Sequence, residues 1–305
     1  PYRVAFMIGI ILLMLMVLRN LNRGAITPMF LPTATPTRTM LSFADEGETY
    51  FIAGDLDRAI EAYRQAVTLD PTNAELQADL ARIMVYSSTL LTVDAERLAR
   101  LNDALDTINK AIEVVPENSM NHAVKGFVLD WLSGSTADEN ERQSLLTQAE
   151  QEVIYAIQLD NQNNLALAYY AEILVDQQKW IQAEQNIRQA LERAPELMDV
   201  HRINGYVQES LGNYNQAISE YEEAIRINPN LTFIYLRIGA NYRRLAAQGS
   251  PTIENPLYIK ALEYFEKAAI INEQLGVNDP IPYFSIATTY TQTGEFFSAG
   301  LNARK

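Results

Sequence analysis

The sequence predicts an all-α protein in which one hydrophobic helix precedes a solenoid of antiparallel helix pairs. One skeleton recurs six times along the 305 residues: a small residue, an aromatic or aliphatic residue four positions later, Ala after three more, and Pro, Asn or Glu after five more. A unit of this size buries little apolar surface alone, so the stacking of neighbouring units has to supply the core. The copies begin at Ala59, Ala104, Ala149, Ala183, Ala217 and Ala261.

Each copy is the second half of a unit whose first half is also patterned. Upstream of the skeleton a small residue and an apolar one recur three positions apart, as in Gly47 and Tyr50. Gly54 and Gly212 stand between the halves of two compact units, where a residue with positive φ can end a helix and turn the chain. The proline follows the second half, where it blocks further helix. Each unit is therefore predicted to be two antiparallel helices.

The repeat resembles the tetratricopeptide repeat (TPR), whose second-half signature it matches closely between about residues 40 and 305. The signature Trp of the first half is replaced in every unit, for example by His122 and His201. The resemblance implies a right-handed superhelix with a concave binding face, and it implies nothing about catalysis. The expected units are residues 40–73, 74–118, 119–163, 164–197, 198–231 and 232–275, with a partial seventh at 280–305.

Three units exceed the 34 residues typical of the repeat, and each carries its extra residues between its two helices. These segments are residues 87–101, 133–144 and 246–256. We expect all three to project from one edge of the solenoid. Either they contact a partner or a neighbouring copy, or they are tolerated surface elaboration, and the sequence leaves both interpretations open.

Local signals locate the second helices of these longer units. Residues 94–115 are expected to form one extended helix. Thr136 and Glu139 have the spacing of a capping box, which predicts a helix start between them. Asn255 before Pro256 predicts an N-cap with proline in the first helical position.

The N-terminal segment predicts a membrane helix. Residues 4–18 carry no charged or polar side chain, and residues 2–21 reach the ~20 residues that a bilayer requires. Arg3 and Arg19 can place their charged groups at the two membrane surfaces. A cleaved signal peptide is the main alternative, but no small-x-small cleavage site follows closely. We therefore expect an uncleaved signal anchor within residues 1–24.

Residues 25–39 are expected to form a semi-rigid spacer between this anchor and the solenoid. Three prolines alternate with threonines in residues 27–39, and an extended proline-rich chain of that length reaches roughly 40 Å at about 3.1 Å per residue. Arginines flank the apolar segment on both sides, so the positive-inside rule does not fix the orientation. The Thr/Pro composition favours a single-pass protein whose solenoid lies on the extracytoplasmic side.

The body of the chain is strongly acidic. Residues 1–38 contain four arginines and no acidic residue, which leaves 20 basic against 38 acidic residues and a net charge of −18 for residues 39–305. Such a body repels the phosphates of nucleic acids, so we expect no nucleic-acid partner. The acidity favours solubility or, less directly, a basic partner. The chain contains no cysteine, so its fold depends on no disulfide.

The sequence predicts no enzyme, no cofactor and no metal site. It contains no glycine-rich phosphate loop, no paired-histidine metal motif and no nucleophile elbow. Its two histidines, His122 and His201, both occupy the register of the signature Trp, where the TPR family packs its two helices together. We therefore expect them to be structural rather than ligands or bases.

The resemblance places a partner-binding groove on the concave face, at first-helix positions. These positions are mostly apolar or aromatic with a few arginines, which suits an extended or helical segment of another protein. Ordinary packing between repeats is the alternative. The predicted groove residues are Phe51, Met120, Phe127, Leu165, Arg202, Tyr206, Phe233, Leu236, Arg243 and Phe284.

Two classes of function follow. The first is a membrane-anchored scaffold that binds or assembles other proteins through the groove and the lengthened edge. The second is a structural subunit of a self-assembling surface filament or large complex, with the hydrophobic helix packed in its core instead of in lipid. The identity of the protein partner does not follow from the sequence.

Overall fold

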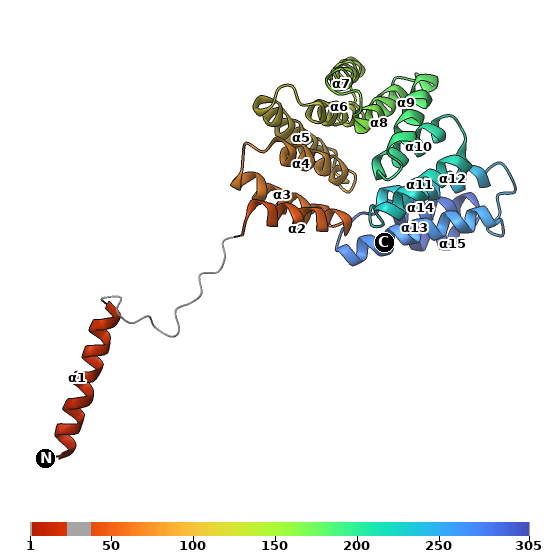
Figure 1. Cartoon of the computed structure of the whole chain (residues 1–305). Helices are drawn as coiled ribbons and strands as arrows, with labels where there is room; N and C mark the ends of the chain where they lie inside the picture. The colour runs from red at the N-terminus through yellow and green to blue at the C-terminus, as the bar shows by residue number, and fades with distance from the viewer. Residues whose placement is uncertain (1, 23–37, 305) are drawn as a thin grey trace. The chain divides into compact units, whose positions relative to one another are not determined.

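The computed structural model describes residues 2–22 and 38–304, which fall into two units, residues 1–38 and 39–305 (Figure 1). Nearly all of the predicted spacer, residues 25–39, lies outside the described residues. The first unit consists of helix α1 (Tyr2–Asn22), whose side chains are exposed over residues 2–19. Its segment Tyr2–Asn20 is long and apolar enough to cross a membrane, with a mean hydropathy of 2.0.

The second unit confirms the predicted fold class. The regular secondary structure of its described residues is entirely α-helical. The helices form seven antiparallel pairs that stack into a TPR-like solenoid. The pairs are α2 (Met40–Ile52) with α3 (Leu56–Leu69), α4 (Ala74–Ser88) with α5 (Asp94–Val114), α6 (Ser119–Ser133) with α7 (Glu139–Leu159), α8 (Asn164–Asp176) with α9 (Trp180–Arg193), α10 (Met198–Ser210) with α11 (Tyr214–Ile227), α12 (Thr232–Ala246) with α13 (Pro256–Leu275), and α14 (Ile281–Gln292) with α15 (Phe296–Asn302).

The recurring skeleton of the sequence forms the contact surface between the two helices of each pair. In each of its six copies the small residue, the aromatic or aliphatic residue and the following Ala are buried, as are Ala217, Tyr221 and Ala224 of α11. These positions recur at helical spacing, so they form the one apolar stripe of the second helix. Gly54 and Gly212 have φ values of 78° and 80°, which confirms that they turn the chain between paired helices.

The extra residues of the three longer units go mainly into their second helices. Helices α5, α7 and α13 contain 21, 21 and 20 residues, whereas α3, α9 and α11 contain 14 each. The segment of residues 87–101 faces the chain's own seventh pair, because Arg97 lines a shallow pocket together with Phe284. This lengthened segment therefore contributes to contacts within the solenoid.

One of the two predicted helix caps is wrong. Asp138, not Thr136, is the N-cap of α7, and its carboxylate accepts hydrogen bonds from the backbone N–H groups of Asn140 and Glu141 at 2.8 and 3.1 Å. The helix begins at Glu139, so Thr136 lies too early to cap it, and its hydroxyl bonds the Glu141 side chain instead. The cap at Asn255 is confirmed, with a 3.0 Å bond from the Leu257 N–H.

The residue that replaces the signature Trp can link a first helix to the turn before it by a hydrogen bond. In four units this side chain donates a hydrogen bond to the carbonyl of the proline six residues earlier, at 2.6 to 2.8 Å. His201 also faces the Glu220 carboxylate at 2.7 Å, and this hydrogen bond raises the pKa of His201. The donors are Gln77, His122, His201 and Tyr235.

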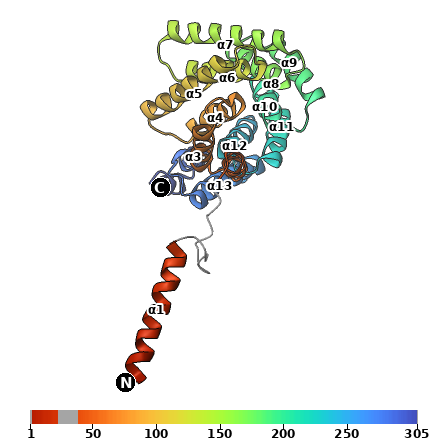
Figure 2. The ribbon, with the colours of Figure 1, turned by 60° about the vertical axis from the view of Figure 1, so that its left-hand side comes forward.

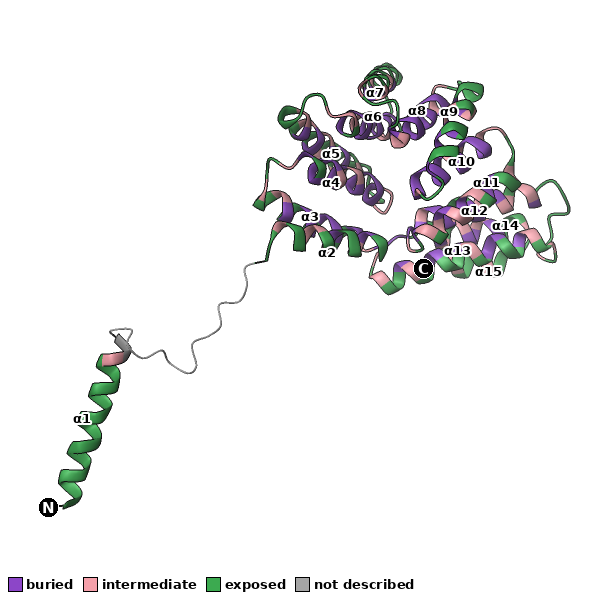
Figure 3. Ribbon diagram, in the orientation of Figure 1, coloured by how far each residue is buried: buried purple, intermediate pink, exposed green. Residues whose placement is uncertain are grey.

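The superhelix turns back on itself within the seven pairs (Figures 1 and 2). The α2–α3 turn meets the α11–α12 turn so closely that a Cβ built on Gly54 would lie 2.5 Å from the Cβ of Asn230. The first helices α4, α6, α8 and α10 are buried over most of their length, whereas α7 and α9 expose an outer face (Figure 3). The concave face is therefore narrow and mostly filled.

Close packing inside each pair generates a prediction about Gly126 of α6. A Cβ at this position would lie 2.2 Å from a methyl group of Val153, and the backbone of Ala149 is also within 3.0 Å. Gly126→Ala should therefore lower the free energy of unfolding by about 1–3 kcal/mol, as overpacked cores do. Gly134→Ala is the matched control, because its Cβ would meet its nearest atom at an ordinary 3.6 Å. Equal stability of both variants in urea unfolding would contradict this close packing of α6 against α7.

Candidate functional site

Four side chains from three first helices meet on the axis of the superhelix. The Asp199 carboxylate of α10 accepts hydrogen bonds from Arg82 Nη1 at 2.8 Å, from the Tyr86 hydroxyl and from the Tyr169 hydroxyl at 3.4 Å. Asp199 is only 3% exposed. We call Arg82, Tyr86, Tyr169 and Asp199 the axial network. It joins α4 to α10 across 113 to 117 residues of sequence.

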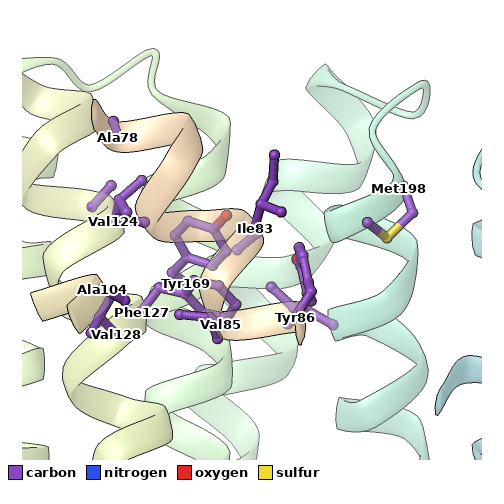
Figure 4. Close-up of a cluster of buried hydrophobic side chains, with 14 of the residues drawn as sticks. Ala78, Ile83, Val85, Tyr86, Ala104, Val124, Phe127, Val128, Tyr169 and Met198 are labelled. Carbon is purple, nitrogen blue, oxygen red and sulfur yellow. The ribbon is translucent and has the colours of Figure 1, made fainter. Parts of the chain in front are cut away.

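Aromatic rings pack around this network, and Figure 4 shows three of them, Tyr86, Phe127 and Tyr169, among aliphatic side chains. The Tyr86 ring stacks on Phe51 and Phe233, with centroid separations of 6.1 and 5.7 Å. Phe127 stacks on Tyr169 at 4.4 Å. These contacts come from α2, α4, α6, α8 and α12, so the first and sixth pairs both pack against the same axis. At this level the concave face is part of the core.

A second buried ion pair lies next to the network. Arg202 of α10 donates two hydrogen bonds of 2.7 Å each to the two carboxylate oxygens of Glu172 in α8. Both side chains are almost fully buried, and the Arg202 guanidinium also lies over the rings of Tyr86 and Phe127, 5.5 Å from each centroid. Such a two-pronged geometry fixes the relative position of two neighbouring first helices.

Beyond these groups the axis opens into a cavity of about 290 Å³, which we call the axial cavity. Its wall combines three acidic residues, three arginines, four aromatic rings and small polar side chains. The lining residues are Ser88, Thr89, Arg97, Asp130, Trp131, Gly134, Ser135, Glu172, Asp176, Arg202, Tyr206, Tyr221, Phe233 and Arg237.

Two of the acidic residues of the axial cavity have raised pKa values. Burial raises the pKa of Asp130 well above its ordinary range, the nearby charges of Asp176 and Glu172 raise it further, and Arg202 opposes them. Burial also raises the pKa of Asp176, although a 2.5 Å hydrogen bond from the Tyr206 hydroxyl works in the opposite direction. These raised pKa values mean that the two carboxyl groups hold a proton at a higher pH than ordinary aspartates do.

The ten predicted groove residues do not lie on one surface. Phe51, Phe127 and Arg202 are buried in the axial packing, and no partner can reach Phe127 while the superhelix is closed. Tyr206 and Phe233 do line the axial cavity, together with Arg202. A partner role for any of these residues stays a prediction.

The remaining five predicted residues lie elsewhere. Met120 and Leu165 line a shallow pocket at the turns between neighbouring pairs. Leu236 and Arg243 pack between the sixth and seventh pairs, where Arg243 lies 5.5 Å from the centroid of the Phe265 ring. Phe284 of α14 is 70% exposed, away from the cavity wall. The tight turn of the superhelix separates these sets.

Sequence reasoning missed Asp130 and Asp176 of the cavity wall. They lie near the ends of α6 and α8, and Asp130 is the only charged residue in the second half of α6. A lone carboxylate in such a segment was the available signal, because burying it is costly unless it is paired or protonated. Which residues would face it depends on contacts between distant units.

The protonation of Asp130 generates a pH-dependent prediction. Between about pH 4 and the raised pKa of Asp130, the folded protein keeps a proton that the unfolded chain has lost. Asp130 therefore lowers the stability of the protein as the pH rises through this range. Asp130→Asn should remove that loss, and its stability relative to the parent should improve by up to about 1.4 kcal/mol per pH unit. Glu192→Gln, at an exposed acid of α9, should leave the pH profile unchanged. Parallel profiles for the parent and Asp130→Asn in urea unfolding would refute the assignment.

Two segments of the chain match TPR models. Residues 47–85 match the model described as TPR repeat, and residues 205–231 match the model described as Tetratricopeptide repeat. A search of the curated proteins finds no match.

Solved structures show the same fold at low identity. TTC0263, a thermophilic TPR protein of Thermus thermophilus, is 17% identical with a TM-score of 0.53, over 67% of this chain and 98% of that one. Human IFIT1, solved as a dimer with m7Gppp-AAAA, is 17% identical with a TM-score of 0.61, over 86% of this chain and 58% of that one. The chain thus spans little more than half of the IFIT1 chain. It carries tetratricopeptide repeats in a helical solenoid of the TPR type.

Proposed function

We propose that this protein is a membrane-anchored scaffold whose TPR solenoid binds a segment of another protein at the axial cavity. The observation that carries the proposal is the cavity itself. It lies where the first helices of five consecutive pairs converge, and its wall mixes aromatic rings with charged groups. TPR solenoids typically serve as scaffolds for protein interactions, and such a mixture of anchors and polar groups is common in protein interfaces.

The rim of the cavity supports access from solvent. Gly134 is exposed, and Thr89, Trp131 and Ser135 are half-buried, whereas Asp130 below them is buried. A side chain that enters between these residues would reach the acidic wall without opening the superhelix. The partner site is therefore narrower than the ten-residue groove that the sequence predicts.

Helix α1 supports the membrane part of the proposal. It is apolar on all sides over residues 4–18, and the 19-residue segment Tyr2–Asn20 contains no buried residue. A helix of this kind requires lipid or a protein bundle around it. We place it in lipid as a single-pass anchor, with the solenoid on the extracytoplasmic side.

The charge of the body argues against an RNA partner, even though IFIT1 was solved with m7Gppp-AAAA. Residues 39–305 carry a net charge of −18. Binding of a phosphate backbone requires the opposite charge.

Self-assembly is the second candidate, because the seventh pair exposes an aromatic face. Phe284, Phe296 and Phe297 are each at least 70% exposed, and Leu301 beside them is 51% exposed. Clusters of exposed aromatic side chains commonly mark interaction sites. In this alternative, copies would associate through α14 and α15 while α1 packs in the core of the assembly.

A photocrosslinking residue in place of Ser135, on the cavity rim, tests the proposal in intact cells. We expect a covalent product with another protein in the membrane fraction, because Ser135 lies beside the entrance. The same residue in place of Ile154, on the outer face of α7, is the matched control and should give no such product. Deleting residues 1–24 should move the protein to the soluble fraction.

Three results would contradict the proposal. Equal crosslinking from both positions would mean that the cavity is not the site. A product of twice the chain mass from Ser135 would favour self-assembly. Sedimentation of the truncated protein with membranes would remove the role of α1 as the anchor.

A further inference from the structure

Two of the three acidic residues of the axial cavity form no ion pair with a described residue. Each arginine of the wall already has an acceptor: Arg202 bonds Glu172, Arg237 bonds Glu209 at 3.2 Å, and Arg97 bonds the Leu91 carbonyl and Asp94. Asp130 and Asp176 receive no arginine or lysine bond among the described residues. Arg202 and Arg237 act on these two acids only through their charge, so Asp130 and Asp176 are the carboxyl groups of the wall without a directly bonded cation.

Asp130 is the decisive residue, because one of its oxygens has no partner. Its side chain is 2% exposed and lines the cavity, and its Oδ1 atom makes no hydrogen bond with any described residue. A buried carboxylate oxygen without a donor is costly, so native structures rarely retain one without a role. A ligand with N–H donors would supply what is missing.

The size and the walls of the cavity specify the kind of donor. About 290 Å³ is at the lower end of ligand pockets and suits a single long side chain. Trp131, Tyr206 and Phe233 provide aromatic surface for a methylene stem or the face of a cation. Trp131 is held edge-on against Tyr86 and Phe127, with centroids 6.5 and 5.8 Å away.

We propose that the axial cavity binds the cationic end of a lysine or arginine side chain, with Asp130 and Asp176 as its acceptors and Trp131 along its stem. This inference rests on the proposed function, since the side chain belongs to the bound segment of the partner. A bound cation favours the ionised form of both carboxyl groups, so a proton held by either of them leaves to solvent. The net charge of −18 on the body draws basic segments towards the solenoid.

The test uses the full chain in detergent and short peptides as probes. Acetyl-Gly-Lys-Gly-amide and acetyl-Gly-Arg-Gly-amide are compared with acetyl-Gly-norleucine-Gly-amide, which has an apolar side chain of similar length. The fluorescence of Trp131 reports binding once Trp180, the second tryptophan of the chain, is replaced by Trp180→Phe. We expect at least one cationic peptide to bind at least tenfold more tightly than the norleucine peptide, and calorimetry in two buffers to detect proton release.

Variants of the cavity wall make the assignment specific. Asp130→Asn should weaken binding of the cationic peptide at least tenfold, and Asp176→Asn provides a second variant if the first does not fold. Glu192→Gln removes one exposed acid of α9, outside the cavity wall, and should leave the affinity unchanged. Equal binding of the norleucine peptide, or full binding by both cavity variants, would overturn the inference.

Three further outcomes separate the possible sources of the cation and the two proposals. If n-pentylamine binds but neither cationic peptide does, the cavity takes free amines and the side-chain inference is wrong. If Ser135 crosslinks a partner but no cationic peptide binds, the scaffold proposal stands and this inference fails. If a cationic peptide binds but no partner is crosslinked, the cavity chemistry stands and the scaffold proposal fails.

Discussion

The buried carboxylate of Asp199 is the constraint on which the closed superhelix depends. It accepts hydrogen bonds from Arg82, Tyr86 and Tyr169, which belong to the second and fourth helix pairs, while Asp199 itself belongs to the fifth. Loss of one partner from a buried ion pair leaves an uncompensated charge, which typically costs about 3–5 kcal/mol. Among the described residues, Asp199 is the one carboxylate within bonding distance of Arg82. The buried charge of Arg82 is therefore neutralised by a direct bond only when α4 and α10 lie side by side.

The closure changes what the concave face can do. First-helix positions that would face solvent in an open superhelix here meet the opposite wall, so Phe51 and Phe127 become core residues. What remains accessible is the axial cavity, where the helices diverge just beyond the network. Its acidic wall, its aromatic rings and its small volume favour one cationic side chain over a long apolar segment. The binding chemistry therefore follows from the superhelical geometry and not from the repeat signature.

Local patterns predicted the fold, whereas contacts between distant units decided the site. The second-helix skeleton, the turn glycines and the N-cap at Asn255 each depend on neighbouring residues, so the sequence predicted them. The capping box at Thr136 failed because Asp138 stands closer to the helix start. The Arg82–Asp199 pair spans 117 residues, and no local pattern shows which units meet. That is why the continuous groove was predicted and the acids of the cavity were missed.

Closure itself can be measured as a distance. Gly54 and Leu56 of the first pair line one small pocket with Asn272 and Leu275 of the sixth, so spin labels at Ala53→Cys and Gln274→Cys would flank this contact in a chain without native cysteines. Pulsed electron paramagnetic resonance should give one short, narrow distribution of the distance between the two labels in the parent. Asp199→Asn should lengthen and broaden this distribution. A broad or long distribution in the parent would contradict the closed superhelix. An unchanged distribution in Asp199→Asn would show that the axial network does not hold it closed.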